Sequence, residues 1–445
     1  MMPSSRLDRR LPEILEEISQ PRTPDYFDDL VGLSARTRQR PAWTLPERWL
    51  PMVDVARQPA LARQVPWRPI AVLALLLLLI AASLVWVAGS RHPLPSPFGP
   101  ARNGLVVYAK GGDIFAADPA SADSTAIVSG PDTDVDPRWS RDGTMIAFDR
   151  MAASGSGPGD VYVARPDGSG LTRVTPDPLA AITGYEFSPD GRQLLISADS
   201  KRVPSLFIAA TDGSGMHQLD VGMPATNAAW RPPDGAEISF MDSDNGDPNG
   251  GNGGIHLVSS RGGDVRTIVN DQRSQGINRG HPLWSPDGSH LVYGEWCDND
   301  CVTGRPLGLE IGNTVQTYII TADGKDARML PNPAGDWQAP ESWSNDGSKV
   351  LVIRGPEVDG QADSQAVALP VDGSAQGVEV AYPGGLGTDP TAAWEWAPDD
   401  SSILGTPTAE SGAPVGAVLL DPVNGTYRTP PWSGVAGTSW QRIAR

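Results

Sequence analysis

Short apolar runs of four to eight residues, separated by turn-forming residues, fill the chain from residue 104 onward. Val161–Ala164 and Leu206–Ala209 are two such runs, and each is followed by an Asp-Gly turn. Runs of this length between Gly, Pro, Asp and Ser clusters are typical of β-strands, because helices of globular proteins need longer segments with a period of 3.6 residues. The pattern therefore predicts an all-β domain over residues 104–445.

One phrase recurs along this domain: an aromatic residue followed by Ser-Pro-Asp-Gly or a close variant. It occurs six times, and Trp440 adds a seventh aromatic without the turn. The aromatic residues stand at positions 139, 187, 230, 284, 343, 396 and 440. Their spacing of roughly 50 residues lies in the range that marks stacked supersecondary units.

The backbone geometry of a tight turn explains the repeated phrase. In Ser-Pro-Asp-Gly, Pro presets φ for a type I turn, Asp tolerates the next position, and Gly accepts a positive φ. A second Asp-Gly type of turn follows in each unit, as in Thr211–Gly215. Each unit thus reads as four antiparallel strands joined by tight turns, which is the composition of a propeller blade.

The number of blades follows from the ends of the domain. Three strand-like runs precede Trp139 and lack a first strand, whereas residues 438–443 form a first strand with no followers. Joined, they make a seventh blade, and the closed ring leaves no open sheet edge. The sequence predicts a seven-bladed β-propeller, with six blades as the alternative if one unit is only an excursion.

The repeats resemble the WD40-like propeller family of the TolB type, whose signature is this aromatic-Ser-Pro-Asp-Gly turn. The resemblance covers residues 104–445. It implies the fold, whereas propellers serve in binding, scaffolding and catalysis alike.

An uncharged run of 19 residues, positions 70–88, precedes the propeller. A helix of this length spans a bilayer core of about 30 Å. The alternatives are a core helix, which does not suit an all-β chain, and a signal peptide, which does not suit 69 preceding residues. We expect a transmembrane helix. The Arg-rich N-terminal side predicts a cytoplasmic N-terminus and an extracytoplasmic propeller in a single-pass cell-membrane protein.

Residues 1–69 form the predicted cytoplasmic tail. Leu11, Leu15 and Ile18 lie on one face of a first short amphipathic helix, and Tyr26 and Phe27 begin the apolar face of a second. Such helices need a membrane surface, each other or a partner protein to cover these faces. Parts of the tail resemble the cytoplasmic tails of bacterial anti-sigma-type membrane proteins, which implies a sigma factor as partner. The tail lacks the His and Cys ligands of the common zinc-containing anti-sigma domain.

Residues 89–103 hold several prolines and read as a spacer between membrane and propeller. The chain has a formal net charge of −18, which argues against nucleic acid as a partner of the propeller. Cys297 and Cys301 are the two cysteines. Outside the cytoplasm they are expected to form a disulfide, with free thiols or metal ligands as the other interpretations.

The central channel is the expected place for a ligand site, because the first strand of each blade lines it. Three residues before the aromatic positions stand Asp136, Asn227 and His281, which would converge on a small polar ligand or ion. The alternative is that they are solvated channel residues with no ligand. The five histidines lack metal-binding spacing, and neither a metal nor a cofactor is predicted.

No Gly-x-Ser-x-Gly motif or other convergent set of acid, base and nucleophile occurs. The sequence therefore favours a membrane-anchored binding or sensory protein that takes an unknown envelope ligand, and we expect no enzymatic activity. An extracytoplasmic hydrolase or lyase using the propeller mouth, or an envelope scaffold, are the alternatives.

Overall fold

The computed structural model describes residues 72–77 and 96–444, apart from 153–158, 177–178, 180, 201–202, 244–252, 298–314, 359–360, 363–364, 381–393, 407–415 and 433–434. The chain divides into two compact units, Met1–Trp86 and Val87–Arg445. In the first unit, residues 72–77 are helical. Across the described residues, no helix has the length and hydropathy needed to cross a membrane.

Most of the expected transmembrane span 70–88 lies outside the described residues. The same holds for the whole tail, including its proposed partner-binding residues Leu11, Leu15, Ile18, Tyr26 and Phe27. Cys297 ends a described strand, whereas Cys301 lies outside the described residues, as does any bond between them.

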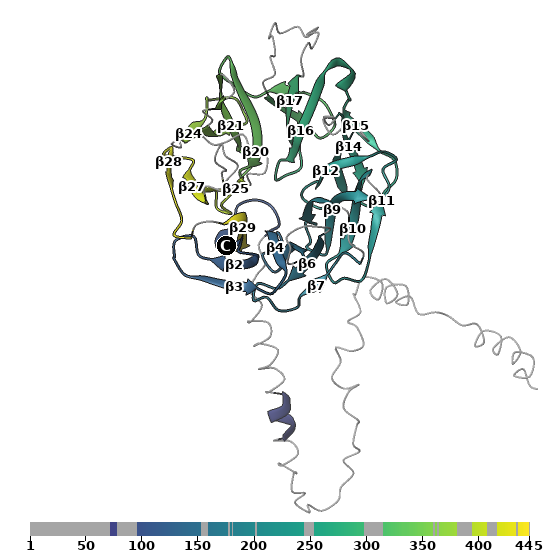
Figure 1. The fold of residues 1–445 in the computed structure, drawn as a ribbon, viewed down its shortest axis with the longest axis vertical. Coiled ribbons are helices and arrows are strands. Elements are labelled where there is room, and N and C mark those ends of the chain that lie inside the picture. The colour runs from purple at the N-terminus through teal and green to yellow at the C-terminus, as the bar shows by residue number, and fades with distance from the viewer. Residues whose placement is uncertain are drawn as a thin grey trace, which may run out of the picture. The chain divides into compact units, whose positions relative to one another are not determined.

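Seven antiparallel sheets form the second unit and surround a central axis, as the blades of a propeller (Figure 1). The prediction of an all-β, seven-bladed propeller is confirmed. From the innermost strand outward, blade 1 holds β29 (Ala436–Ile443), β1 (Arg102–Lys110), β2 (Asp113–Ala117) and β3 (Ser124–Val128); blade 2 holds β4 (Thr133–Trp139), β5 (Ile146–Met151), β6 (Asp160–Ala164) and β7 (Thr172–Arg173); blade 3 holds β8 (Ile182–Phe187), β9 (Gln193–Ser200), β10 (Val203–Ala210) and β11 (Met216–Leu219).

The remaining blades follow the same order. Blade 4 holds β12 (Ala225–Trp230), β13 (Glu237–Asp242), β14 (Ile255–Ser259) and β15 (Arg266–Val269); blade 5 holds β16 (Ile277–Trp284), β17 (His290–Cys297), β18 (Gln316–Thr321) and β19 (Arg328–Met329), with the 3-10 helix η3 (Arg273–Gln275) before it; blade 6 holds β20 (Asp336–Trp343), β21 (Lys349–Val358), β23 (Gln365–Pro370) and β24 (Val378–Val380), with β22 (Gln361–Ala362) on β21; blade 7 holds β25 (Trp394–Trp396), β26 (Ile403–Gly405), β27 (Val418–Asp421) and β28 (Thr426–Arg428).

The C-terminal strand closes the ring. β29 pairs antiparallel with β1, and this register places Trp440 opposite Val106 and Ile443 opposite Arg102. Blade 1 therefore takes its inner strand from one end of the propeller and its other three strands from the other end, as the sequence predicts.

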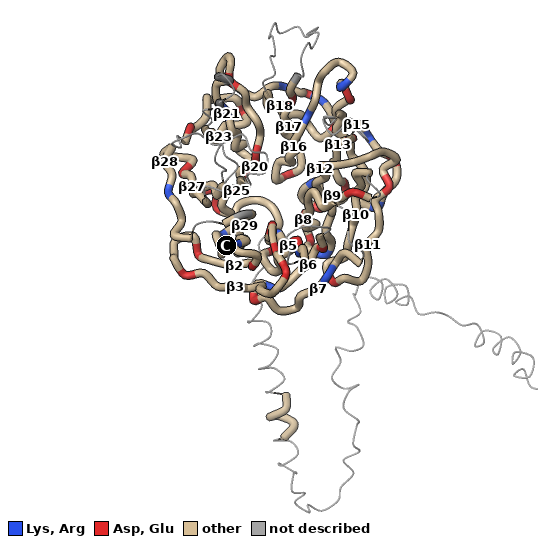
Figure 2. Tube along the Cα trace, viewed as in Figure 1, with Lys and Arg blue, Asp and Glu red and all other residues tan. Residues whose placement is uncertain are grey.

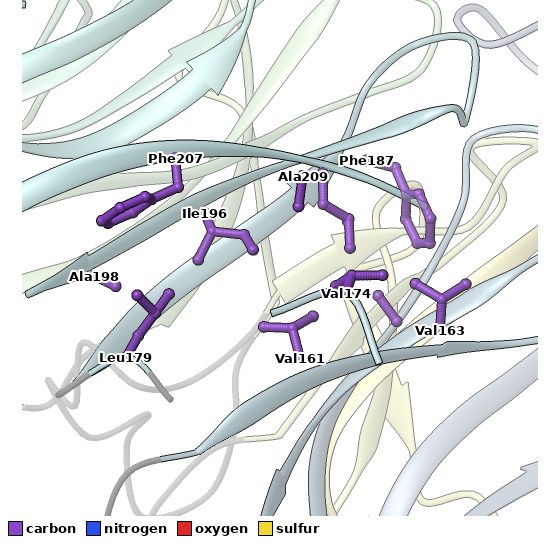
Figure 3. Packing of buried hydrophobic residues seen from close by; sticks show 11 residues of the cluster. Val161, Val163, Val174, Leu179, Phe187, Ile196, Ala198, Phe207 and Ala209 are labelled. Atoms are coloured by element: carbon purple, nitrogen blue, oxygen red, sulfur yellow. The ribbon is translucent and has the colours of Figure 1, made fainter. Parts of the chain in front are cut away.

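Neighbouring blades are held together by apolar side chains from both facing sheets. Between blades 2 and 3, Val161 and Val163 of β6 pack in one buried cluster with Phe187, Ile196 and Phe207 of blade 3 (Figure 3). Full burial of one such side chain contributes about 1.5–3 kcal/mol. The alternation of apolar positions along the strands thus supplies the contacts between blades.

Ser and Asp recur in the repeated turn because their side chains make hydrogen bonds within it. In blade 3, the Ser188 hydroxyl donates to the Asp190 carboxylate at 2.7 Å and accepts the Gln193 backbone N–H at 3.0 Å. Ser285 repeats the first bond with Asp287 at 2.6 Å in blade 5. These bonds satisfy polar groups within the turn itself, so the turn forms the same way in successive blades.

The turn glycine fits against the preceding blade. Gly288 has φ +66°, and a Cβ added there would overlap the carbonyl oxygen of Pro232 in blade 4. A Cβ added at Gly235 would lie 2.8 Å from the Pro189 ring of blade 3. The motif therefore fixes the spacing between blades as well as the hairpin.

Candidate functional site

A cavity of about 480 Å³ lies on the central axis and is lined by the inner strands of all seven blades. Pro232, Pro286 and Pro398 of the repeated turns are among its walls, so it is situated at the end of the channel where these turns gather. A concave site of this volume suits a small ligand. Charged residues of both signs occur on strands around the ring (Figure 2).

The motif aromatics build the framework of the cavity. The indole N–H of Trp230 donates to the Glu186 carbonyl of the preceding blade at 3.3 Å, and Trp343 donates to the Leu283 carbonyl at 3.0 Å. In each pair the acceptor is the residue just before the preceding blade's aromatic. That position also lines the cavity, because Glu186 and Leu283 are both in its wall.

Two cavity carboxylates also join blades through their side chains. Glu186 accepts the backbone N–H of Trp230 at 3.2 Å, and Glu395 accepts that of Trp440 at 2.8 Å. Burial raises the pKa of Glu395, while the Trp440 N–H and the nearby arginines Arg138, Arg141 and Arg442 oppose this shift.

Arginines form another part of the wall. Arg141 pairs with Glu186 at 3.3 Å, and its guanidinium lies 4.9 Å from the centre of the Phe98 ring. Arg442 donates to the Asn345 side chain at 2.5 Å and to the carbonyl of Gly99. Burial, together with the charge of Arg141, lowers the pKa of Arg442 to about 10. The segment that enters blade 1 thus covers part of the cavity mouth.

Three charged side chains in the cavity wall, Asp136, Arg138 and Glu341, make no hydrogen bond or ion pair in the part of the chain that the structure describes. Glu341 lies on β20 beside the bulge where the β20–β21 register shifts. Burial raises the pKa of Glu341 to about 8. This carboxyl group therefore carries its proton at neutral pH in the unliganded protein.

A second set of polar groups lies in blades 2 and 3. The Tyr185 hydroxyl donates to the backbone carbonyl of Asp136, and burial raises the pKa of Tyr185 well above its usual value. Burial, followed by the charges of Asp136 and Asp160, raises the pKa of Asp149 to about 6. Tyr185 lines the cavity, whereas Asp149 does not.

The three channel residues suggested by the sequence fall in different places. Asp136 lines the cavity, Asn227 is not among the lining residues, and the side chain of His281 lies outside what the structure describes. Asp136 and Asn227 have φ +52° and +49°, and Gly437 in the equivalent position has φ +51°. Asp, Asn and Gly are the residues that enter this left-handed region most readily, so the bulge accounts for their occurrence there.

The lining residues that this spacing missed include Arg138, Glu186 and Glu395, each immediately before a motif aromatic. The position immediately before each motif aromatic can be read from the sequence, so it could have identified these three lining residues. Glu341 stands two residues before Trp343, and no spacing rule singles it out. Among the described residues, no group of three or more His, Cys, Asp or Glu side chains is arranged to hold a metal ion.

Comparison with known proteins places the fold. No family model matches the chain. A stretch of 76 residues is 40% identical to dipeptidyl-peptidase 5 of Porphyromonas endodontalis, and this match covers 17% of the chain and 10% of the relative. The tricorn protease structure matches with a TM-score of 0.53 and 12% identity, over 76% of this chain and 34% of that one. TolB from Acinetobacter baumannii matches with a TM-score of 0.45 and 15% identity, over 67% and 66%.

At these identities the likeness shows the fold alone, and TolB is among the matched structures, as the repeats suggested. The expectation that the chain has no enzymatic activity is wrong as an exclusion, because the tricorn protease and dipeptidyl-peptidase 5 are among the matches. The resemblance of the tail to anti-sigma proteins receives no support from them.

The environment of Glu341 predicts a pH-dependent effect of its substitution. Because the folded-state pKa lies above the usual value, ionisation of Glu341 opposes folding as the pH rises from about 4.5 to 8, and the cost is constant above that. Glu341→Gln is expected to raise the free energy of unfolding by on the order of 2 kcal/mol at pH 9 and to change it little at pH 4, allowing for solvent screening in the channel.

Urea titrations at the two pH values measure this difference. Glu379→Gln is the matched control, since Glu379 lies on the outer strand β24 and is 54% exposed. Equal effects of Glu341→Gln at pH 4 and pH 9 would contradict the assigned environment.

Proposed function

We propose that the propeller binds a small ligand in the axial cavity. The observation that carries this proposal is the cavity itself, to which all seven inner strands contribute and in which three charged side chains have no partner within the described residues. Charged side chains without partners in a concave site favour a ligand that satisfies them.

A cavity-filling variant tests the proposal. Ala229 lies in the cavity wall on β12, and Ala229→Trp would occupy part of the space. Thermal melting of the full chain with a library of small metabolites should identify compounds that raise the melting temperature of the wild type. Those compounds are expected to lose their effect on Ala229→Trp, because the site is filled.

Leu171→Trp is the matched control, because Leu171 is 45% exposed and lies outside the cavity wall. A compound that stabilises the wild type, the control and Ala229→Trp equally binds elsewhere. If every stabilising compound behaved so, the cavity would not be the binding site.

Catalysis in the same cavity is a second candidate function. Glu341 retains its proton at neutral pH, and a carboxyl that burial keeps protonated is suited to act as a general acid. The tricorn protease and dipeptidyl-peptidase 5 among the matches favour considering this role. A substrate turned over by the wild type should show a rate that declines above about pH 8, and Glu341→Gln should abolish the turnover.

We also propose that the apolar run 70–88 anchors the chain in the cell membrane with the propeller outside, and that the tail docks a cytoplasmic partner such as a sigma factor. The length of the run and the amphipathic tail support this. Protease added to intact cells should leave a small protected N-terminal fragment. Protection of the propeller would contradict the orientation, and unchanged tail-bound proteins in Leu11→Asp/Leu15→Asp/Ile18→Asp would contradict the docking role.

A further inference from the structure

Glu341 differs from the other two unpaired charges of the cavity. Asp136 and Arg138 have opposite charges and stand two residues apart on β4. The pKa of Glu341 is shifted by burial, without a contribution from any charged neighbour. Among the described residues, the wall around Glu341 thus lacks a cation for this carboxylate.

Apolar and aromatic side chains stand on either side of Glu341. Blade 5 contributes Pro282, Leu283 and Trp284 to the cavity wall, and blade 7 contributes Trp394 and Trp396 together with Glu395, whose carboxylate accepts the Trp440 N–H. A carboxylate between such walls is complementary to a positive charge carried on an apolar body.

A metal ion suits this part of the wall less well. Calcium takes six to eight oxygen ligands and magnesium keeps an octahedral shell, whereas Glu341 offers one carboxylate here. The described residues contain no group of three or more metal-ligating side chains that would complete such a shell.

We propose that the cavity binds an organic ammonium ion, with its positive charge paired to the Glu341 carboxylate and its apolar body against blades 5 to 7. This rests on the proposed function of the cavity and names its ligand class. Because Glu341 holds a proton at neutral pH before the ligand enters, binding displaces that proton into solution, and the net charge of the site stays the same with the ligand bound.

Calorimetric titration of the full chain tests the inference, with phenethylammonium as the probe and 2-phenylethanol as its uncharged analogue of similar shape. The ammonium ion should bind at least about tenfold more tightly than the alcohol at pH 8. Its dissociation constant should rise about tenfold for each unit that the pH falls from 8 to 6, since Glu341 must then release a proton and the ammonium remains charged. About one proton per bound ion should appear in the buffer dependence of the enthalpy at pH 7.

Glu341→Gln should weaken ammonium binding at least about tenfold at pH 8 and remove its pH dependence, whereas the outer-strand control Glu379→Gln should leave both unchanged. No binding of phenethylammonium, equal binding of the alcohol, or unchanged binding by Glu341→Gln would overturn the inference. If both probes bind equally and Ala229→Trp abolishes both, the cavity remains a ligand site and the ammonium specificity alone fails.

Discussion

Deleting residues 436–445 is expected to prevent cooperative folding of the propeller. The deletion removes β29, the inner strand of blade 1, and exposes the edge of β1, where Val106 and Tyr108 are buried. Trp440 itself is 2% exposed, and truncating one buried Trp costs about 3–5 kcal/mol. Because domains of this kind are stable by about 5–15 kcal/mol in total, loss of the whole strand should consume most of that stability.

Circular dichroism and urea unfolding of the truncated and full chains measure the effect. Trp440→Ala provides a graded version with an expected loss of about 4 kcal/mol. Tyr427→Ala is the control, since Tyr427 is 40% exposed on the outer strand β28 and should cost less than about 1 kcal/mol. A truncated chain that melts as the full chain does would show that the ring does not depend on this closure.

Gly288→Ala is expected to destabilise the propeller by about 4 kcal/mol. The added methyl group would meet the backbone oxygen of Pro232 in the preceding blade, where neither side can move as a flexible side chain does. Steric overlap of this kind costs about 1–3 kcal/mol, and the φ of +66° adds about 1–2 kcal/mol for a residue with a Cβ.

Gly222→Ala separates the two contributions. Gly222 has φ +74° and no atom within 4 Å of an added Cβ, so its substitution should cost only the backbone term, about 1 kcal/mol. Chemical denaturation of both variants at one temperature gives the comparison. Equal losses for Gly288→Ala and Gly222→Ala would mean that the motif glycine serves the turn alone and does not set the distance between blades.

The fold was predictable from the sequence because the same short motif forms the hairpin turn and the contact between neighbouring blades. Ser285 and Asp287 satisfy the turn, and Gly288 fits against the preceding blade, so the residues that make a hairpin also recur at the spacing of the blades. Trp440 stood alone in the sequence without its turn, and this asymmetry indicated that the ring closes between the two ends of the domain.

The cavity was less predictable because bulges shift the inner strands. Positions three before the motif aromatics look like channel positions on an ideal strand, but the register of β12 shifts between Thr226 and Ala229. After the shift, Ala229 rather than Asn227 lines the cavity. The raised pKa of Glu341 arises from burial in the assembled ring, which a single repeat does not reveal.

Sequence motifs could not settle enzymatic function for a related reason. Nucleophile and metal motifs are local in the sequence, whereas the groups with raised pKa values, such as Glu341 and Asp149, owe them to burial in the assembled ring. Burial of this kind is a property of several blades together, and the sequence spacing does not record it.

The pairing of β1 with β29 also determines how the ring responds to a pulling force. Arg102 at the start of β1 lies opposite Ile443 at the end of β29. A load applied between these two points acts at one end of the strand pair and perpendicular to the strands. The hydrogen bonds of the ladder then break one after another, as in a zipper, rather than sharing the load. Traction on the two ends of the propeller would thus open blade 1 at low force, whereas the hairpin-linked blades would remain closed.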